Sequence, residues 1–278
     1  MSRPRISPRP SEVATLTTQQ IRAAFLVENV FTPDGRIEMT FTDLDRLAVG
    51  GARPGQNVVV LDNDRETGSE FFLARRELGM INVGAPGTVT ADGKEFNLGN
   101  LDGLYVSMGT RDVRFKSRDP AQPAKFFLLS APAHAAYPTT LIEKNKITPR
   151  AIGAPATANQ RKIHQYIVPG AVKSCQLDMG FTELAEGSVW NTMPPHTHSR
   201  RSEIYFYFDL PGDNLVSHFM GEPTATKSIW VRNNQAVLSP PWSIHCGCGT
   251  SAYRFIWAMA GENQVYDDMD KVAPADLR

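Results

Sequence analysis

Two histidines two residues apart and a nearby glutamate are the residues of this sequence with the clearest potential for chemistry. His196 and His198 lie in PPHTHSRRSEIYFYF, and because residues i and i+2 of a strand face the same side, both imidazoles can reach one point. Glu203 opens the apolar run EIYFYF, on the expected returning strand of a hairpin, and His245 follows a Pro-Pro turn in SPPWSIHCG. Three histidines and one carboxylate suit Zn²⁺, Fe²⁺, Mn²⁺, Co²⁺ or Ni²⁺. This spacing favours one divalent metal site over a set of scattered polar residues.

The remaining histidines and the cysteines lack such a pattern. His134 and His164 have no companion ligand and are predicted to be structural. His218 lies on the expected strand NLVSHFMG, where a surface or hydrogen-bonded histidine is favoured over a ligand. Cys246 and Cys248 flank the last histidine of the metal pattern and are predicted to be small buried residues.

Polar residues next to Glu203 are candidates for a substrate pocket. Tyr205 and Tyr207 share its side of the strand by alternation, and they suit a pocket wall and an aromatic core equally well. Arg200 and Arg201 could bind a substrate carboxylate, but a solvated hairpin turn is the favoured interpretation.

The elements that position these residues are predicted to be mostly strands. The 278 residues include 21 Gly and 20 Pro, and short runs rich in Val, Ile, Phe, Tyr and Thr lie between them, a pattern typical of an all-β sandwich or barrel. Asp92-Gly93 predicts a tight hairpin turn. Thr17 and Gln20 form a capping box that predicts a short helix, and TLIEKNK suggests another at about residues 140–146.

Two domains are expected, at residues 1–150 and 151–278. The connection is placed in the segment 120–160, which is rich in Pro, Ala and Thr. DGLYVSMGTRDVRF in the first half resembles QAVLSPPWSIHCGCGTSAYRF in the second, which indicates a duplicated barrel. No HxH pattern precedes residue 150, and Arg111 or Asp112 falls near the place of the last histidine, so the first domain is expected to hold no metal.

Composition and charge restrict the partners. Lys plus Arg number 29 and Asp plus Glu number 29, so net charge gives no argument for a nucleic-acid or membrane partner. The three cysteines, an odd and low count, argue against a disulfide framework and fit a reducing compartment. MSRPRISPRP is not followed by an apolar run typical of a signal peptide, and no window approaches a membrane span. A cytoplasmic soluble protein is expected.

Longer strings of residues resemble a known family. HxHxxxxE followed by a Pro-turn-His is similar to the two-part cupin motif, with Ser243 in place of the usual Gly and a long interval between the two parts. NTMPPHTHSRRSEIYFYF, SPPWSIHCGCGT and FIWAMAGENQVYDDMD in the second half, with RRELGMINVG and PAKFFLLSAPAHAAYPT in the first, narrow the resemblance. The chain resembles the 5-dehydro-4-deoxy-D-glucuronate isomerase (4-deoxy-L-threo-5-hexosulose-uronate ketol-isomerase) family.

This resemblance implies a bicupin of two jelly-roll barrels with a few short helices. It further implies one Zn²⁺ per chain in the second barrel, held by His196, His198, Glu203 and His245. The implied activity is aldose–ketose isomerisation of a keto-deoxyuronate in pectin degradation by a homohexamer. Glu203 is a possible general base as well as a ligand, and a hydride shift between the two carbons is another route. Two rival hypotheses are an iron-dependent cupin oxygenase that uses the same four residues and a non-catalytic sugar-binding cupin.

Overall fold

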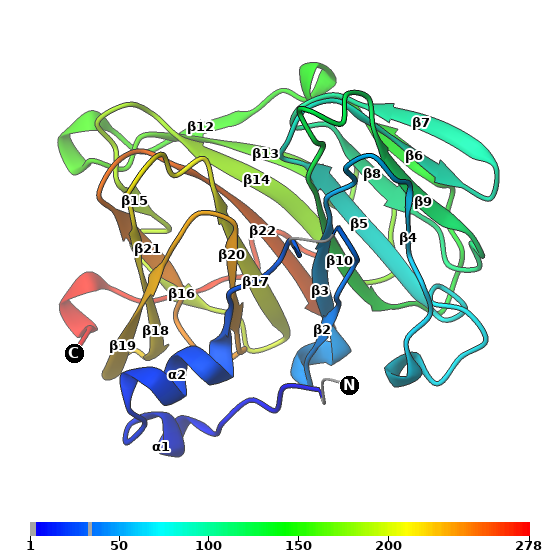
Figure 1. The fold of residues 1–278 in the computed structure, drawn as a ribbon. Coiled ribbons are helices and arrows are strands. Elements are labelled where there is room, and N and C mark those ends of the chain that lie inside the picture. Colours follow the sequence, from blue (N-terminus) through cyan, green and yellow to red (C-terminus); the bar gives the residue numbers. More distant parts are fainter. Residues whose placement is uncertain (1–3, 33–34) are drawn as a thin grey trace. The chain divides into compact units, whose positions relative to one another are not determined.

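Strands form most of the regular secondary structure in the computed structural model, which describes residues 4–32 and 35–278 (Figure 1). The contacts divide the chain into two units. Besides the first residues of the chain, unit 1 comprises Asn29–Thr148 and Tyr166–Asp178. Unit 2 comprises Ile6–Glu28, Pro149–Gln165 and Met179–Arg278. The predicted all-β fold class is confirmed. The sequential cupin domains 1–150 and 151–278 stay a prediction. The contacts group Ile6–Glu28 with most of the second half of the chain, and Tyr166–Asp178 with most of the first half.

Unit 1 contains two antiparallel sheets. The strand order is β11-β8-β5-β10-β3-β2 in the six-stranded sheet and β4-β9-β6-β7 in the four-stranded sheet. Their bounds are β2 Thr40–Phe41, β3 Ala48–Ala52, β4 Val59–Val60, β5 Arg76–Asn82, β6 Gly87–Ala91, β7 Lys94–Leu98, β8 Gly103–Val106, β9 Val113–Ser117, β10 Phe126–Pro132 and β11 Thr140–Ile142. Leu78, Leu104 and Phe115 belong to one buried apolar cluster to which both sheets contribute. Aliphatic, aromatic and methionine side chains thus make up the core between these strands.

Unit 2 repeats this arrangement. Its seven-stranded sheet has the order β1-β20-β17-β22-β14-β13-β12, its four-stranded sheet has the order β15-β21-β18-β19, and β16 pairs with β23. The bounds are β1 Leu26–Val27, β12 Arg150–Ile152, β13 Arg161–Ile167, β14 Asp178–Leu184, β15 Trp190–Asn191, β16 His196–Thr197, β17 Arg201–Phe208, β18 Val216–Glu222, β19 Ala225–Val231, β20 Gln235–Ser239, β21 Cys246–Gly249, β22 Arg254–Gly261 and β23 Asp270–Lys271. Every pairing described within these sheets is antiparallel.

The predicted repeat agrees with this strand order. In unit 1, β8 lies next to β5 and is followed along the chain by β9, which lies between β4 and β6. In unit 2, β20 lies next to β17 and is followed by β21, which lies between β15 and β18. The two segments that resemble each other in sequence therefore hold equivalent places. The predicted hairpin is also confirmed, since Asp92 (φ 45°) and Gly93 (φ 81°) connect β6 to β7 with the positive φ values that a tight turn needs.

Helices are short. They comprise α1 (Pro10–Val13), α2 (Thr18–Phe25) and the 3₁₀ turns η1 (Leu44–Arg46), η2 (Arg65–Thr67), η3 (Lys144–Lys146), η4 (Pro155–Thr157) and η5 (Pro274–Asp276). The capping box of α2 is confirmed. The Thr17 hydroxyl accepts a hydrogen bond from the backbone N–H of Gln20, and the Gln20 side-chain oxygen accepts one from the backbone N–H of Thr17. The helix predicted at 140–146 is wrong. Thr140–Ile142 pairs instead with β8, as suits β-branched residues, and only η3 follows it.

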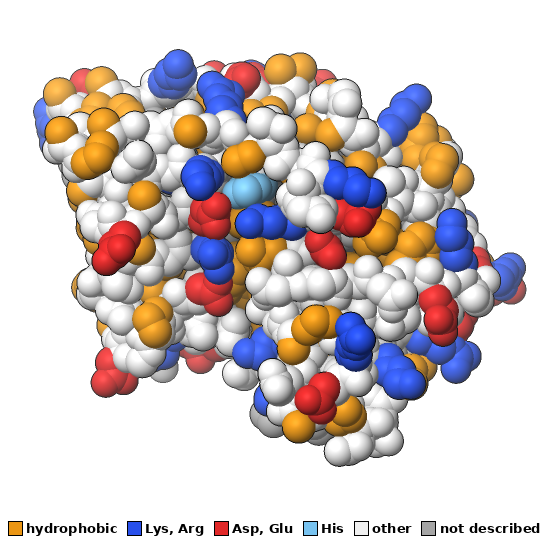
Figure 2. Space-filling view, turned by 90° about the horizontal axis from the view of Figure 1, so that it is seen from above, with side chains coloured by type: hydrophobic (Ala, Val, Ile, Leu, Met, Phe, Trp, Pro, Cys, Tyr) orange, Lys and Arg blue, Asp and Glu red, His pale blue; other side chains and the backbone are white. Residues whose placement is uncertain are grey.

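The surface agrees with the neutral composition. Figure 2 shows Lys and Arg side chains interspersed with Asp and Glu over the face in view. Within the described residues, no helix combines the length and the apolarity that crossing a membrane requires.

Candidate metal centre

The four predicted ligands converge in unit 2. His196 lies on β16, His198 directly after it, Glu203 on β17 and His245 directly before β21. The Nε2 atom of His196 lies 3.0 Å from that of His198 and 2.9 Å from that of His245. One Glu203 carboxylate oxygen, Oε2, lies 3.0 Å from Nε2 of His198 and 2.9 Å from Nε2 of His245. The sequence pattern therefore brings one donor atom from each residue to a common point.

The chemistry of these donors fits a divalent cation. All four residues are buried, and their ligand atoms lie within 4.8 Å of one another. His198 Nδ1 lies 2.9 Å from the carbonyl oxygen of Asp268, to which a protonated Nδ1 donates, so the Nε2 lone pair is directed at the other donors. Two ring nitrogens 2.9–3.0 Å apart share at most one proton, so the cluster presents unprotonated nitrogens next to a carboxylate. This is the donor set that Zn²⁺ and related metals prefer.

The electrostatics of the cluster keep its donors ready for a cation. Burial lowers the pKa of His196 well below its ordinary value, and His245 and His198 add to that effect. Burial also lowers the pKa of His245. Burial would by itself raise the pKa of Glu203, but His245 and His198 hold the pKa of this carboxyl well below its usual range. At neutral pH the imidazoles of His196 and His245 are therefore uncharged and the Glu203 carboxylate is ionised, which are the forms that bind metal.

The segment after β22 holds the ligands in place. His196 pairs with Lys271 across β16 and β23, and the Asp268 carbonyl accepts from His198. Arg201 is 1% exposed, and its guanidinium donates to the carbonyls of Val265 (3.1 Å) and Tyr266 (2.9 Å). The prediction that Arg201 lies in a solvated turn is therefore wrong. A burial that depends on carbonyls about sixty residues away has no local signal in the sequence.

Arg200 has a different role from its neighbour. Its guanidinium forms a two-point ion pair with the Asp268 carboxylate, at 2.7 and 2.5 Å, and its side chain is 39% exposed. Neither Arg200 nor Arg201 lines the cavity described next, so both act by fixing the segment around Asp268.

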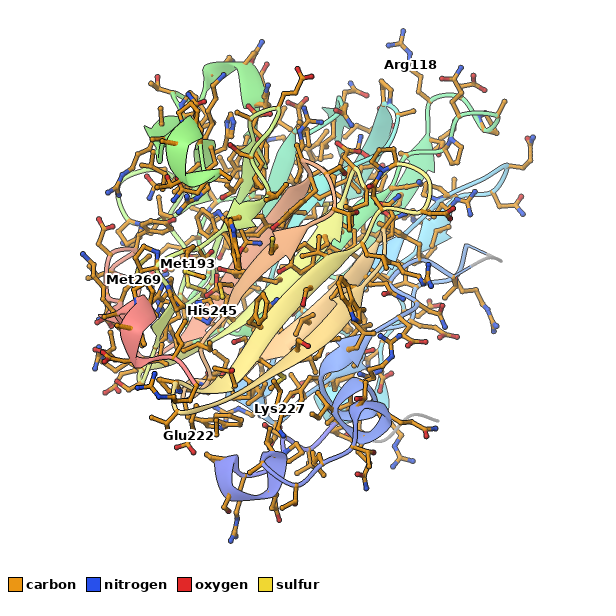
Figure 3. The ribbon with its side chains drawn as sticks, turned by 90° about the vertical axis from the view of Figure 1, so that its left-hand side faces the viewer. Arg118, Met193, Glu222, Lys227, His245 and Met269 are labelled. Atoms are coloured by element: carbon orange, nitrogen blue, oxygen red, sulfur yellow. The ribbon has the colours of Figure 1, made fainter. Side chains whose placement is uncertain are left out.

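A cavity of about 310 Å³ opens beside the cluster, and His196, His198 and Glu203 form part of its wall. Met193 and Met269 lie close to His245 on one side of the unit, and both line the cavity (Figure 3). Trp257, Phe255 and Tyr266 contribute aromatic surface. A mostly apolar wall with a few polar groups is typical of a small-molecule site.

Tyr205 is a cavity residue, whereas Tyr207 and His218 lie in the core. The Tyr205 hydroxyl lies 2.9 Å from that of Thr192, which also lines the cavity and has a positive φ of 48°. Tyr207 lies outside the cavity wall, and its hydroxyl is 2.8 Å from Nδ1 of His218. His218 is fully buried, as a hydrogen-bonded rather than a ligand histidine, and burial with the nearby His245 lowers its pKa to about 3.

The other predicted residues lie outside the cluster. His164 stacks on Phe181 and lies 3.2 Å from Glu183, which fits a structural role, and His134 is exposed. Cys246 is buried as predicted, and Cys248 is only half-buried. Sequence patterns missed the cavity residues Thr192, Arg161, Trp257, Tyr266 and Lys271. Thr192, Trp257 and Tyr266 fall within strings that carry the family resemblance, but the five residues lie on five separate segments, and no spacing between them marks a shared cavity.

Comparisons with known proteins agree with the site and the fold. The chain is 54% identical over 273 residues to the 4-deoxy-L-threo-5-hexosulose-uronate ketol-isomerase of Opitutus terrae, with 98% of each chain covered. It is 51% identical to the protein of the same name from Caldicellulosiruptor bescii, with 99% of each covered. An IolB-like protein from Salmonella typhimurium has a similar fold, with a TM-score of 0.68 and 15% identity over 81% of this chain and 87% of that one. The model of the KduI/IolB family matches residues 24–273, and the chain belongs to this family.

Proposed function

We propose that the protein is a metal-dependent ketol-isomerase that converts 5-dehydro-4-deoxy-D-glucuronate to 3-deoxy-D-glycero-2,5-hexodiulosonate. The observation that carries the proposal is the buried set of three histidines and one glutamate, of which His196, His198 and Glu203 line a cavity, in a chain 54% identical to a relative with that activity in its name. The identity extends over nearly the whole length of both chains, so the site and its surroundings are compared together.

The reaction moves a carbonyl from C1 to C2 of an α-hydroxy aldehyde. A proton moves from C2 to C1, and the proton of the C2 hydroxyl moves to the C1 oxygen. In the enediolate between these states, negative charge is shared by the two oxygens. A bound divalent cation would supply Lewis-acid stabilisation of that charge. His196, His198, Glu203 and His245 would hold the cation.

We assign the proton transfer to Glu203. Its carboxylate lies on the cavity wall, and the two neighbouring histidines keep it ionised, so it can accept the C2 proton and return it to C1. The Tyr205 and Thr192 hydroxyls, 2.9 Å apart on the same wall, can hydrogen-bond to the sugar hydroxyls. Trp257, Phe255 and Tyr266 exclude water from the reacting carbons.

Three further features belong to the proposal. The metal is Zn²⁺ at one ion per chain, since the donor set of nitrogen and carboxylate oxygen suits it. The protein works as a homohexamer in the cytoplasm, in the breakdown of pectin. Metal analysis of the purified protein and light scattering test the metal content and the hexamer, respectively. A monomer at micromolar concentration would contradict the hexamer.

The decisive experiment is an assay of the purified protein with 5-dehydro-4-deoxy-D-glucuronate, before and after treatment with a chelator. We expect turnover that is lost on chelation and restored by Zn²⁺. Oxygen uptake with the same substrate would instead indicate an oxygenase, and tight binding without turnover would indicate a sugar-binding protein. Either result would overturn the proposed function.

A further inference from the structure

The cavity has a cationic end across the sheet from the metal donors. Its wall includes residues of adjacent strands in the order β17, β22, β14, β13 and β12, from Glu203 to Arg161 and Arg150. Three strand intervals separate β17 from β13, which is about 14 Å between backbones at a spacing of roughly 4.8 Å. An arginine that extends from β13 therefore approaches one end of a six-carbon ligand whose other end lies at the donors.

The three cations of the cavity wall have different partners. Arg150 is exposed and forms an ion pair with Asp267 at 3.1 Å. Lys271 is exposed to solvent on β23. Arg161 is half-buried, and among the described residues its guanidinium has one hydrogen-bond acceptor, the carbonyl of Asn159 at 2.8 Å, and no carboxylate within 4.0 Å. Arg161 is thus a cavity cation without an anionic partner.

The contact with Asn159 also decides which edge of the guanidinium is available. Nη1 donates to that carbonyl, which leaves the Nε and Nη2 hydrogens on the adjacent edge. These two hydrogens form the fork that binds the two oxygens of a carboxylate side by side. Burial lowers the pKa of Arg161, so the charge is disfavoured where it stands and an arriving anion would stabilise it.

We propose that Arg161 binds the carboxylate of the substrate and thereby places the opposite end of the sugar chain, C1 and C2, at His196, His198 and Glu203. The inference rests on the proposed function, because it takes the uronate as the substrate. Arg161 is then the residue that selects acidic over neutral sugars. No spacing in the sequence points to it, since it is a single arginine at the start of a strand.

The test compares Arg161→Met with the wild-type protein on two compounds. One is 5-dehydro-4-deoxy-D-glucuronate, and the other is the same compound with its carboxylate reduced to a primary alcohol. On the uronate we expect kcat/KM to fall about 10–100-fold, as for the loss of hydrogen bonds to a charged group. On the alcohol we expect wild type and variant to agree within about threefold. Arg161→Lys keeps the charge without the fork and should lie between them.

A binding measurement makes the test independent of turnover. The probe is the analogue in which C1 is reduced to an alcohol, which keeps the carboxylate but cannot isomerise. By calorimetry on the zinc-loaded protein, its Kd should rise about 10–100-fold in Arg161→Met. The exposed Arg232, which lies outside the cavity wall, provides the matched control Arg232→Met, expected to keep the wild-type Kd. Bound zinc should remain equal in all variants.

The outcomes separate the two proposals. If the wild type binds the analogue through Arg161 but does not turn over the uronate, the carboxylate site stands and the isomerase function fails. If Arg161→Met keeps the wild-type Kd and kcat/KM, the carboxylate site is overturned. Equal losses on the uronate and on the alcohol would overturn it as well, because the effect of Arg161 would then not depend on the carboxylate.

Discussion

Strands β5 of unit 1 and β17 of unit 2 hold equivalent places in their sheets but carry their acidic residue on opposite faces. Arg76 pairs with the last residue of β10, and Arg201 pairs with the last residue of β22. Leu78 pairs with the last residue of β8, and Glu203 pairs with the last residue of β20. Arg76-Glu77-Leu78 therefore matches Arg201-Ser202-Glu203. Glu203, the glutamate of the candidate metal centre in unit 2, has a buried leucine as its counterpart in unit 1.

The glutamate of unit 1 became a structural residue instead. Glu77 is fully buried and accepts a hydrogen bond from the Tyr105 hydroxyl at 2.9 Å. It also accepts from three successive backbone N–H groups at 2.7, 3.0 and 2.9 Å, those of Cys175, Gln176 and Leu177. Four donors satisfy the carboxylate, so it holds the 175–177 backbone and has no lone pair directed at a cluster of histidines.

The difference shows how small a change separates a metal site from an apolar core. A shift of one residue along a strand moves a side chain to the other face of the sheet. Counted back from Leu78, the positions that match His196 and His198 are Phe71 and Leu73, which carry no metal-binding atom. Asp112 directly precedes β9, as His245 precedes β21, but its carboxylate forms an ion pair with Arg114. The arginine at the start of the strand is common to both units, and in each it donates to backbone carbonyls.

The largest expected effect is the loss of metal from unit 2. The double variant His196→Ala, His198→Ala removes two of the four donors, so bound metal should fall from one per chain to near zero and turnover by more than about 10⁴-fold. Elemental analysis and the isomerase assay measure this. His134→Ala removes an exposed histidine of unit 1 and should change neither quantity. One metal per chain retained in the double variant would place a site elsewhere.

The next effect separates the two roles of Glu203. Glu203→Gln keeps the shape but removes the charge, so metal binding should weaken. A rate deficit of about 10²–10⁴-fold should remain at saturating zinc, because an amide cannot accept the C2 proton. His245→Ala is the control, since its defect should follow the metal content alone. Full recovery of Glu203→Gln with added zinc would exclude Glu203 as the base, and Tyr205 would become the next candidate on the cavity wall.

In unit 1 the corresponding acid should affect stability rather than chemistry. Glu77→Ala leaves three backbone N–H groups and the Tyr105 hydroxyl without their acceptor, which should cost about 3–5 kcal/mol of unfolding free energy. Chemical denaturation gives the stability, and the metal content should stay at the wild-type level. Glu95→Ala, at an exposed position of β7, should change stability by less than about 0.5 kcal/mol. A metal-free Glu77→Ala protein with wild-type stability would contradict the division of roles.

The smallest effect concerns a hydroxyl of the cavity. Tyr205→Phe removes the hydrogen bond to Thr192 but keeps the ring that packs beside His245. The loss of one such bond corresponds to about 2–12-fold in kcat/KM, with bound zinc unchanged. Tyr207→Phe, in the core outside the cavity, is the comparison and should act on stability rather than on turnover. If Tyr205→Phe lowers the rate by more than about 10²-fold, Tyr205 takes part in proton transfer.

Sequence patterns predicted many of the strands and the convergence of His196, His198, Glu203 and His245 for a physical reason. The pattern HxHxxxxE with a later histidine expresses strand alternation and a hairpin, which are local rules. The buried state of Arg201, the strand at Thr140–Ile142 and the cavity role of Arg161 depend on neighbours far along the chain. Local composition therefore favoured a solvated turn for Arg201 and a helix for Thr140–Ile142. It indicated no function for Arg161.

The segment between β22 and β23 binds both the ligands and their neighbours. Its carbonyls accept from His198 and Arg201, its Asp268 carboxylate pairs with Arg200, and β23 pairs with β16, the strand of His196. An ordered segment is therefore expected to raise the affinity of the cluster for a metal ion, and a bound ion is expected to stabilise the ordered segment to the same extent. A bound ion slows the exchange of the segment's amide hydrogens with solvent, and a cut within the segment weakens the ion's binding by the same coupling free energy. Damage to this segment is therefore expected to weaken the binding of any ion that the four-residue cluster holds.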